Sequence, residues 1–93
     1  MYICNKIIKN KYDWGIVRTI IYGDKYELNI YQEDIDDIID DIIEGPKIET
    51  FIYNEDGETI LVMKTKHENI NGLVFTFKEI EVFVPNELLF DNV

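Results

Sequence analysis

The residue types that most often perform covalent or metal chemistry are scarce in this chain of 93 residues. It contains one cysteine, Cys4, one histidine, His67, and no serine. A cysteine nucleophile needs a neighbouring base and a zinc ion needs about four nitrogen, sulfur or oxygen ligands, so one residue of each type predicts neither. Cys4 lies in an apolar stretch that predicts a buried side chain, and His67 lies in a polar stretch that predicts a solvated one. The sequence therefore predicts that the protein is not an enzyme and has no catalytic, cofactor-binding or metal-binding residues.

Carboxylates are the one reactive type in excess, with 19 acidic against nine basic residues and a net charge of −10 at pH 7. Seven lie in a stretch of twelve residues without any basic residue: Glu33, Asp34, Asp36, Asp37, Asp40, Asp41 and Glu44. On a helix, like charges four residues apart, such as Asp36 and Asp40, destabilise by about 0.2–0.5 kcal/mol per pair. Aspartate is also a poor helix former, and negative charge is unfavourable at a helix C-terminus. Local rules are broken most often where function requires it, so this row is a candidate binding site.

The charge density of this segment suggests what it would bind. Twelve helical residues span about 18 Å, which gives one negative charge per roughly 2.6 Å, against one per about 1.7 Å for duplex DNA. A protein groove that binds phosphates would attract such a helix. Glu55, Asp56 and Glu58 form a second acidic patch, and Tyr31 and Tyr53 precede the two patches as aromatic anchors. The predicted partner-binding residues are Glu33, Asp36, Asp37, Asp40, Asp41, Glu44, Glu55, Asp56, Glu58, Tyr31 and Tyr53.

Other interpretations of the acidic residues stay open. Asn54 to Glu58 resembles part of an EF-hand calcium loop, but that register places Ile52 and Met63 at ligand positions, so a hairpin turn is expected instead. The acidic helix can equally be a solvated face that serves solubility. The protein would then be a structural or regulatory interaction module, immunity-like or homo-oligomeric through exposed strand edges. A small enzyme or ligand-binding protein would require a deep pocket lined by perturbed acids.

Strands are predicted on both sides of the acidic segment, because runs rich in isoleucine, valine and tyrosine alternate with polar turns. They cover residues 2–9, 14–23, 25–31, 47–53, 58–66 and 73–84. Gly23-Asp24 and the segment Asn54 to Gly57 predict antiparallel hairpins. In the last strand the apolar residues change parity, which predicts a β-bulge or bend near Lys78 and Glu79. Residues 86–93 are expected to dock as a turn of helix.

The acidic segment is predicted to be an amphipathic helix. Its isoleucines recur at i, i+3, i+4, i+7 and i+8: Ile35, Ile38, Ile39, Ile42 and Ile43. Asp34 is the expected N-cap, and Gly45 followed by Pro46 is the expected stop.

These elements predict one domain, residues 1–93, of the α+β class. We expect an antiparallel sheet, or sheets, of about six strands with one amphipathic acidic helix, in the order β-β-β-α-β-β-β. Apolar runs are far shorter than the roughly 20 residues that span a bilayer. The start MYICNKIIKN also has charges where a signal peptide needs an apolar stretch. A soluble, cytoplasmic protein is therefore expected.

In size, charge and the run EDIDDIIDDIIE, the chain resembles small phage-encoded inhibitors of the anti-CRISPR and anti-restriction type. The resemblance is one of overall profile. It implies a non-enzymatic inhibitor in the bacterial host cytoplasm that occupies the basic groove of a nucleic-acid-binding protein, a CRISPR effector or restriction enzyme, by nucleic-acid mimicry. The net charge of −10 separately predicts no direct contact with nucleic acid or membranes, and a homodimer is the other assembly to consider.

Overall fold

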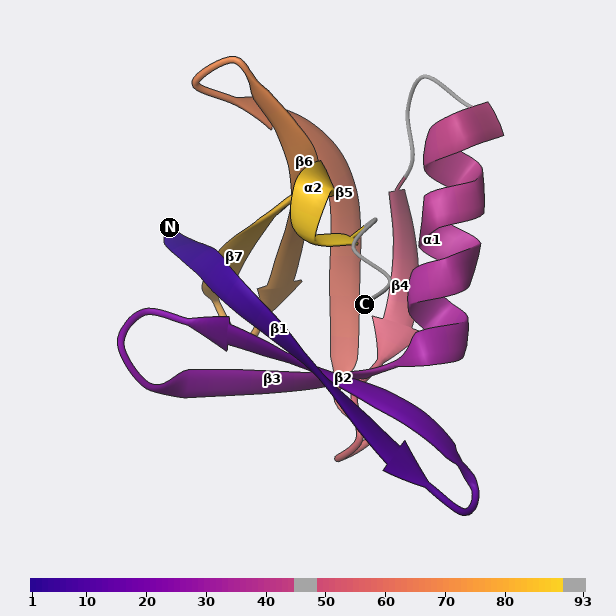
Figure 1. The fold of residues 1–93 in the computed structure, drawn as a ribbon. Coiled ribbons are helices and arrows are strands. Elements are labelled where there is room, and N and C mark those ends of the chain that lie inside the picture. The colour runs from indigo at the N-terminus through magenta and orange to yellow at the C-terminus, as the bar shows by residue number, and fades with distance from the viewer. Residues whose placement is uncertain (45–48, 90–93) are drawn as a thin grey trace.

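The computed structural model describes residues 1–44 and 49–89, without the side chains of residues 41–44. Strands form most of this part of the chain (Figure 1). In order, the elements are β1 (Tyr2–Tyr12), β2 (Gly15–Tyr22), β3 (Tyr26–Tyr31), α1 (Gln32–Glu44), β4 (Glu49–Tyr53), β5 (Thr59–His67), β6 (Ile70–Phe77), β7 (Ile80–Pro85) and α2 (Asn86–Leu89).

The seven strands form one sheet in the order β3-β2-β1-β7-β6-β5-β4. All neighbours are antiparallel except β1 and β7, which run parallel and pair Tyr2 with Val82 and Ile3 with Phe83. This parallel pair joins an N-terminal meander to a C-terminal one. The sheet curves into a half-barrel, and in Figure 1 β2 and β3 run at a steep angle to β4 and β5.

The predicted fold class is therefore wrong. The protein is mostly β, with a mixed seven-stranded sheet and the order β-β-β-α-β-β-β-β-α, rather than an α+β protein with about six antiparallel strands. The error lies in residues 73–84, which form parts of two strands instead of one bulged strand. Lys78 and Glu79 have φ values of 48° and 64° and form a two-residue turn that reverses the chain. Positive φ at both central residues is the signature of a tight hairpin turn.

The hairpin also explains the change in apolar parity from which the bulge was predicted. Phe77 pairs directly with Ile80 across the turn, and residues opposite each other in a sheet point to the same face. The two predicted trios therefore face the core together: Leu73, Phe75 and Phe77 of β6 with Ile80, Val82 and Val84 of β7. Glu68 and Asn69 form a second turn of this kind, with φ values of 48° and 69°, between β5 and β6.

The other predicted turns are largely confirmed. β2 and β3 form an antiparallel hairpin, although its loop has three residues, 23–25, instead of two. β4 and β5 form the second one around Asn54 to Gly57. The turn from β1 to β2 consists of Asp13 and Trp14, so the placement of Trp14 inside the second strand is wrong.

An isolated bridge connects the two ends of the sheet. Ile30 of β3 forms an isolated bridge with Asn54, and the Glu55 N–H donates to the Asn29 carbonyl at 3.3 Å. Because β3 and β4 are at opposite ends of the strand order, this bridge brings the loop after β4 close to the strand that leads into α1.

The core is one cluster of buried apolar side chains from the sheet and both helices. Ile35 and Ile38 of α1 are 3% and 1% exposed, and Leu89 of α2 joins the same cluster. Burying an isoleucine stabilises by about 1.5–3 kcal/mol, which exceeds the cost of about 0.2–0.5 kcal/mol for one like-charge pair. The isoleucine face therefore determines that this acidic segment is helical.

The limits of the two helices agree only partly with the predictions. α1 begins at Gln32, directly after β3, so Asp34 lies in the first turn and is not the N-cap. α1 is described as far as Glu44, and the predicted stop at Gly45 and Pro46 lies outside the described residues. α2 confirms a helical turn at Asn86–Leu89, whereas residues 90–93 of that prediction lie outside the described part. Within residues 1–44 and 49–89, no helix is long and apolar enough to cross a membrane.

Candidate functional site

The acidic side chains of α1 lie on the face opposite its buried isoleucines. Glu33, Asp36, Asp37 and Asp40 are exposed, and Asp34 is partly buried. Asp41 and Glu44 belong to the helix, but their side chains, like those of Ile42 and Ile43, lie outside the described part. The structure therefore brings at least four of the predicted residues onto one exposed helix face, which we call the acidic face.

Among the described side chains, no lysine or arginine forms an ion pair with this face, and the one ion pair joins Lys78 to Glu58. Burial raises the pKa of Asp34, and the charges of Asp37 and Glu33 raise it further. The negative charges of Asp37 and Glu33 are thus close enough to act on Asp34.

Gln32 connects the acidic face to a buried arginine. Its Nε2 donates to Asp36 Oδ1 at 2.7 Å, and its Oε1 accepts a hydrogen bond from Arg18 Nε. Arg18 of β2 is only 8% exposed. Gln32 therefore orients Asp36 through a neutral amide, and the Asp36 side chain is exposed to solvent.

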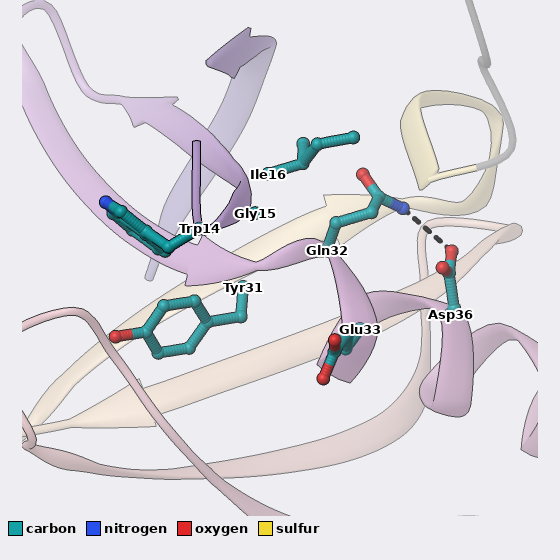
Figure 2. Close-up of a pocket in the computed structure, with 7 residues that line it drawn as sticks. All are labelled: Trp14, Gly15, Ile16, Tyr31, Gln32, Glu33 and Asp36. Atoms are coloured by element: carbon teal, nitrogen blue, oxygen red, sulfur yellow. Dashed lines mark hydrogen bonds between the residues drawn. The ribbon is translucent and has the colours of Figure 1, made fainter. Parts of the chain in front are cut away.

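A groove of about 550 Å³ opens between the β1–β2 turn and the first turns of α1 (Figure 2). We call it the aromatic–acid groove, and its lining residues are Trp14, Gly15, Ile16, Tyr31, Gln32, Glu33 and Asp36. In Figure 2, Trp14 and Tyr31 lie at one end and the hydrogen-bonded Gln32 and Asp36 at the other. Tyr31 pairs with Val17 in the sheet, which places it near the Trp14 turn and directly before the helix.

The aromatic end of the groove is exposed and ordered by ring contacts. Trp14 is 59% exposed and stacks on Tyr12, with ring centroids 4.8 Å apart and planes at 3°. Tyr31 meets Trp14 edge to face, with centroids 6.0 Å apart and planes at 74°. An exposed tryptophan held by two tyrosines is typical of aromatic anchors at protein interfaces.

The second predicted patch forms a loop organised by Asn54. The Asn54 Oδ1 accepts hydrogen bonds from the N–H groups of Asp56 at 3.0 Å and Glu58 at 2.8 Å. Glu55 and Asp56 are exposed, and Tyr53 is 59% exposed on β4. Because Asn54 is bridged to β3, this loop lies near the strand that leads into α1.

Glu58 differs from its neighbours because its carboxylate already has partners. It accepts a hydrogen bond from Asn54 Nδ2 at 2.9 Å and forms the ion pair with Lys78. The hydrogen bond from Lys78, then that from Asn54, lowers the pKa of Glu58. Glu58 therefore stabilises the loop and is less available for a partner than Glu55 or Asp56.

Cys4 and His67 both pack against other residues of the fold. Cys4 is 2% exposed, and burial raises the pKa of its thiol. His67 is half-buried at the end of β5, with its ring 5.3 Å from that of Phe83, so it lies in a strand rather than in the predicted loop. Across the described residues, no group of three or more histidine, cysteine, aspartate or glutamate side chains could hold a metal ion.

Sequence reasoning did not place Trp14, Gln32 or Arg18 at this site. The sequence Asp13-Trp14-Gly15 resembles a turn, and that signal could have moved Trp14 out of the strand. Arg18 is an isolated charge in an apolar strand, which indicates a partly buried cation with a polar partner. No family model matches the chain, and neither the curated proteins nor the solved structures give a significant match.

Proposed function

We propose that the protein is a non-enzymatic inhibitor whose acidic face occupies the basic nucleic-acid-binding groove of a partner protein. The proposed partner is a CRISPR effector or restriction enzyme in a bacterial cytoplasm. The observation that carries the proposal is the exposed row Glu33, Asp36, Asp37 and Asp40, which has no ion pair among the described side chains, on a helix whose other face is anchored in the core.

The anchoring of α1 supports mimicry of a nucleic-acid backbone. Ile35 and Ile38 fix the helix on the sheet, so its carboxylates are presented at fixed spacing and little conformational entropy is lost on binding. A groove that binds phosphates with arginine and lysine would find charges at similar separation. Occupying the groove would exclude DNA or RNA, and no catalytic step is needed.

The structure adds aromatic contacts to this charged surface. Trp14 and Tyr31 lie beside the start of α1, and Tyr53 lies near the bridged loop that carries Glu55 and Asp56. Aromatic anchors supply much of the binding energy of interfaces, whereas exposed charges mainly increase the association rate and the selectivity. The proposed interface therefore combines both contributions.

The test is competition with nucleic acid for a captured partner. The tagged protein is used to recover nucleic-acid-binding proteins from bacterial lysates at low and high salt, and displacement of labelled DNA or RNA from each recovered protein is measured. Reversing Asp36, Asp37, Asp40 and Asp41 to lysine should abolish displacement. Reversing four acidic residues elsewhere, Asp24, Glu27, Glu68 and Glu81, changes the net charge equally and should leave most of it.

Two results would reject the proposal. Displacement that survives reversal of the helix carboxylates would show that the acidic face is not the contact surface. Equal loss in both variants would show a general effect of net charge, with no specific role for α1.

A second candidate function is favoured by an exposed apolar area on the outer side of β4 and β5. Phe51 is 64% exposed, Tyr53 59% and Met63 41%. β4 ends the strand order, so its edge could pair with a second copy. In this homo-oligomeric module the acidic face would be only a solvated surface. Sedimentation would then detect a dimer that Phe51→Glu dissociates and that the helix charge reversals leave intact.

A further inference from the structure

We propose that the aromatic–acid groove is a binding site for one arginine side chain of the protein partner. This inference rests on the proposed function, because it names the residue type that the acidic surface would take from the partner's nucleic-acid-binding groove. It assigns one partner arginine to a defined position, whereas attraction between charges alone would not fix where the partner binds.

The aromatic end of the groove suits a flat cation. Trp14 stacks parallel to Tyr12, and the rings of Trp14 and Tyr31 are nearly perpendicular, with centroids 6.0 Å apart. A cation within about 6 Å of an indole centroid is attracted by the negative face of the ring. With Trp14 59% exposed, the indole is accessible to a side chain that enters from solvent.

The acidic end supplies the charge complement. Glu33 and Asp36 line the groove and are exposed. Asp36 is held in place by the Gln32 amide, and Gln32 is held by Arg18, so the carboxylate is oriented before any partner arrives. Orientation in advance reduces the entropy lost on binding. Two carboxylates beside two aromatic rings would repel phosphate and attract a cation.

Arginine fits this arrangement better than lysine. Its planar guanidinium stacks on aromatic faces and donates two parallel hydrogen bonds to one carboxylate, whereas the lysine ammonium is compact and strongly hydrated. Arginine is also a common phosphate ligand in nucleic-acid-binding proteins. An arginine bound in the groove would no longer be available to hold a phosphate.

Trp14 allows the groove to be observed directly, because it is the only tryptophan of the chain. The probe is a blocked tripeptide with one central arginine, compared with the same peptide carrying lysine or glutamine. Fluorescence of Trp14, and the NMR signal of its indole N–H, should change saturably with the arginine peptide. The lysine peptide should bind more weakly and the glutamine peptide should have no saturable effect.

Variants separate the contributions of the groove residues. Glu33→Gln and Asp36→Asn should each weaken arginine-peptide binding about two- to fivefold, the value of one favourable surface ion pair. Tyr31→Leu should weaken it by a similar factor, the value of one exposed cation–π contact. Glu81→Gln, an equal charge change on β7, is the matched control and should leave binding unchanged. Circular dichroism checks that each variant is folded.

The inference is overturned if the glutamine or lysine peptide binds as well as the arginine peptide, or if Glu33→Gln and Asp36→Asn bind like the control. Its failure can be told apart from failure of the proposed function. If the arginine peptide does not bind but reversal of Asp37 and Asp40 still abolishes displacement of nucleic acid, only the groove assignment fails. If the peptide binds but those reversals leave displacement intact, the proposed function fails.

Discussion

Replacing Asp37 and Asp40 by asparagine should make the protein more stable. The double change removes four like-charge pairs four residues apart on α1: Glu33 with Asp37, Asp36 with Asp40, Asp37 with Asp41, and Asp40 with Glu44. At about 0.2–0.5 kcal/mol per pair, the free energy of unfolding should rise by about 0.8–2.0 kcal/mol. For a domain of this size, that corresponds to roughly 3–16 °C in Tm. Asparagine and aspartate have similar helix propensities, and both side chains are exposed, so packing should not change.

The assay is thermal and urea unfolding followed by circular dichroism, at about 0.01 M and about 1 M salt. The Debye length falls from about 30 Å to about 3 Å between these conditions, so the advantage of the variant should be present at low salt and largely lost at high salt. The control carries Asp24→Asn and Glu81→Gln, the same change in net charge away from α1. A helix variant that is no more stable than this control at low salt would refute the view that the acidic face is locally unfavourable.

Two further predictions concern the sheet and the helix start. Gly72→Ala should destabilise the protein by about 1–3 kcal/mol in urea unfolding, because a Cβ there would lie 2.3 Å from the Val84 carbonyl oxygen and 2.8 Å from the Phe83 ring. The second prediction concerns pH, since burial and then Asp37 raise the pKa of Asp34 in the folded protein. A raised carboxyl pKa opposes folding above that pKa, and the effect is lost as the pH falls toward the ordinary value of about 4. Asp34→Asn should therefore be more stable than the wild type at pH 7 by a margin that shrinks toward pH 4, and a margin independent of pH would contradict this assignment.

Local patterns in the sequence predicted most of the elements but not how they assemble. The isoleucine spacing located α1, and the glycine-containing turns located the hairpins on either side of it. The pairing of β1 with β7 joins residues 2 and 3 to residues 82 and 83, and no short-range pattern carries that information. The seventh strand was missed because Lys78 and Glu79 lack the glycine or asparagine typical of a tight hairpin. A bulge and a two-residue turn also produce the same change in apolar parity.

The candidate site was likewise predicted only in part, because its local residue pattern was evident but its assembly was not. The row of carboxylates was evident from composition, and its exposed members are where the helical period placed them. The aromatic–acid groove was not predicted, because it needs the turn at Trp14, the end of β3 at Tyr31 and the start of α1 to meet. Arg18 and Gln32 belong to separate elements, and their hydrogen bond depends on that same meeting.

The two faces of α1 are under different constraints, and this difference bears on function. The burial of Ile35 and Ile38 holds the helix on the sheet whatever polar residues occupy the other face. The fold would accept lysine, glutamine or alanine there, and neutralising some of the acids should even stabilise it. Solubility does not require the row either, because removing four negative charges from −10 leaves −6, still within the range of about 2–8 that keeps small domains soluble. A row that neither stability nor solubility requires fits the recognition role that we propose. The Asp37 and Asp40 double variant therefore tests both the stability cost of the acidic face and its proposed binding role, since it should gain stability and lose affinity for a basic partner.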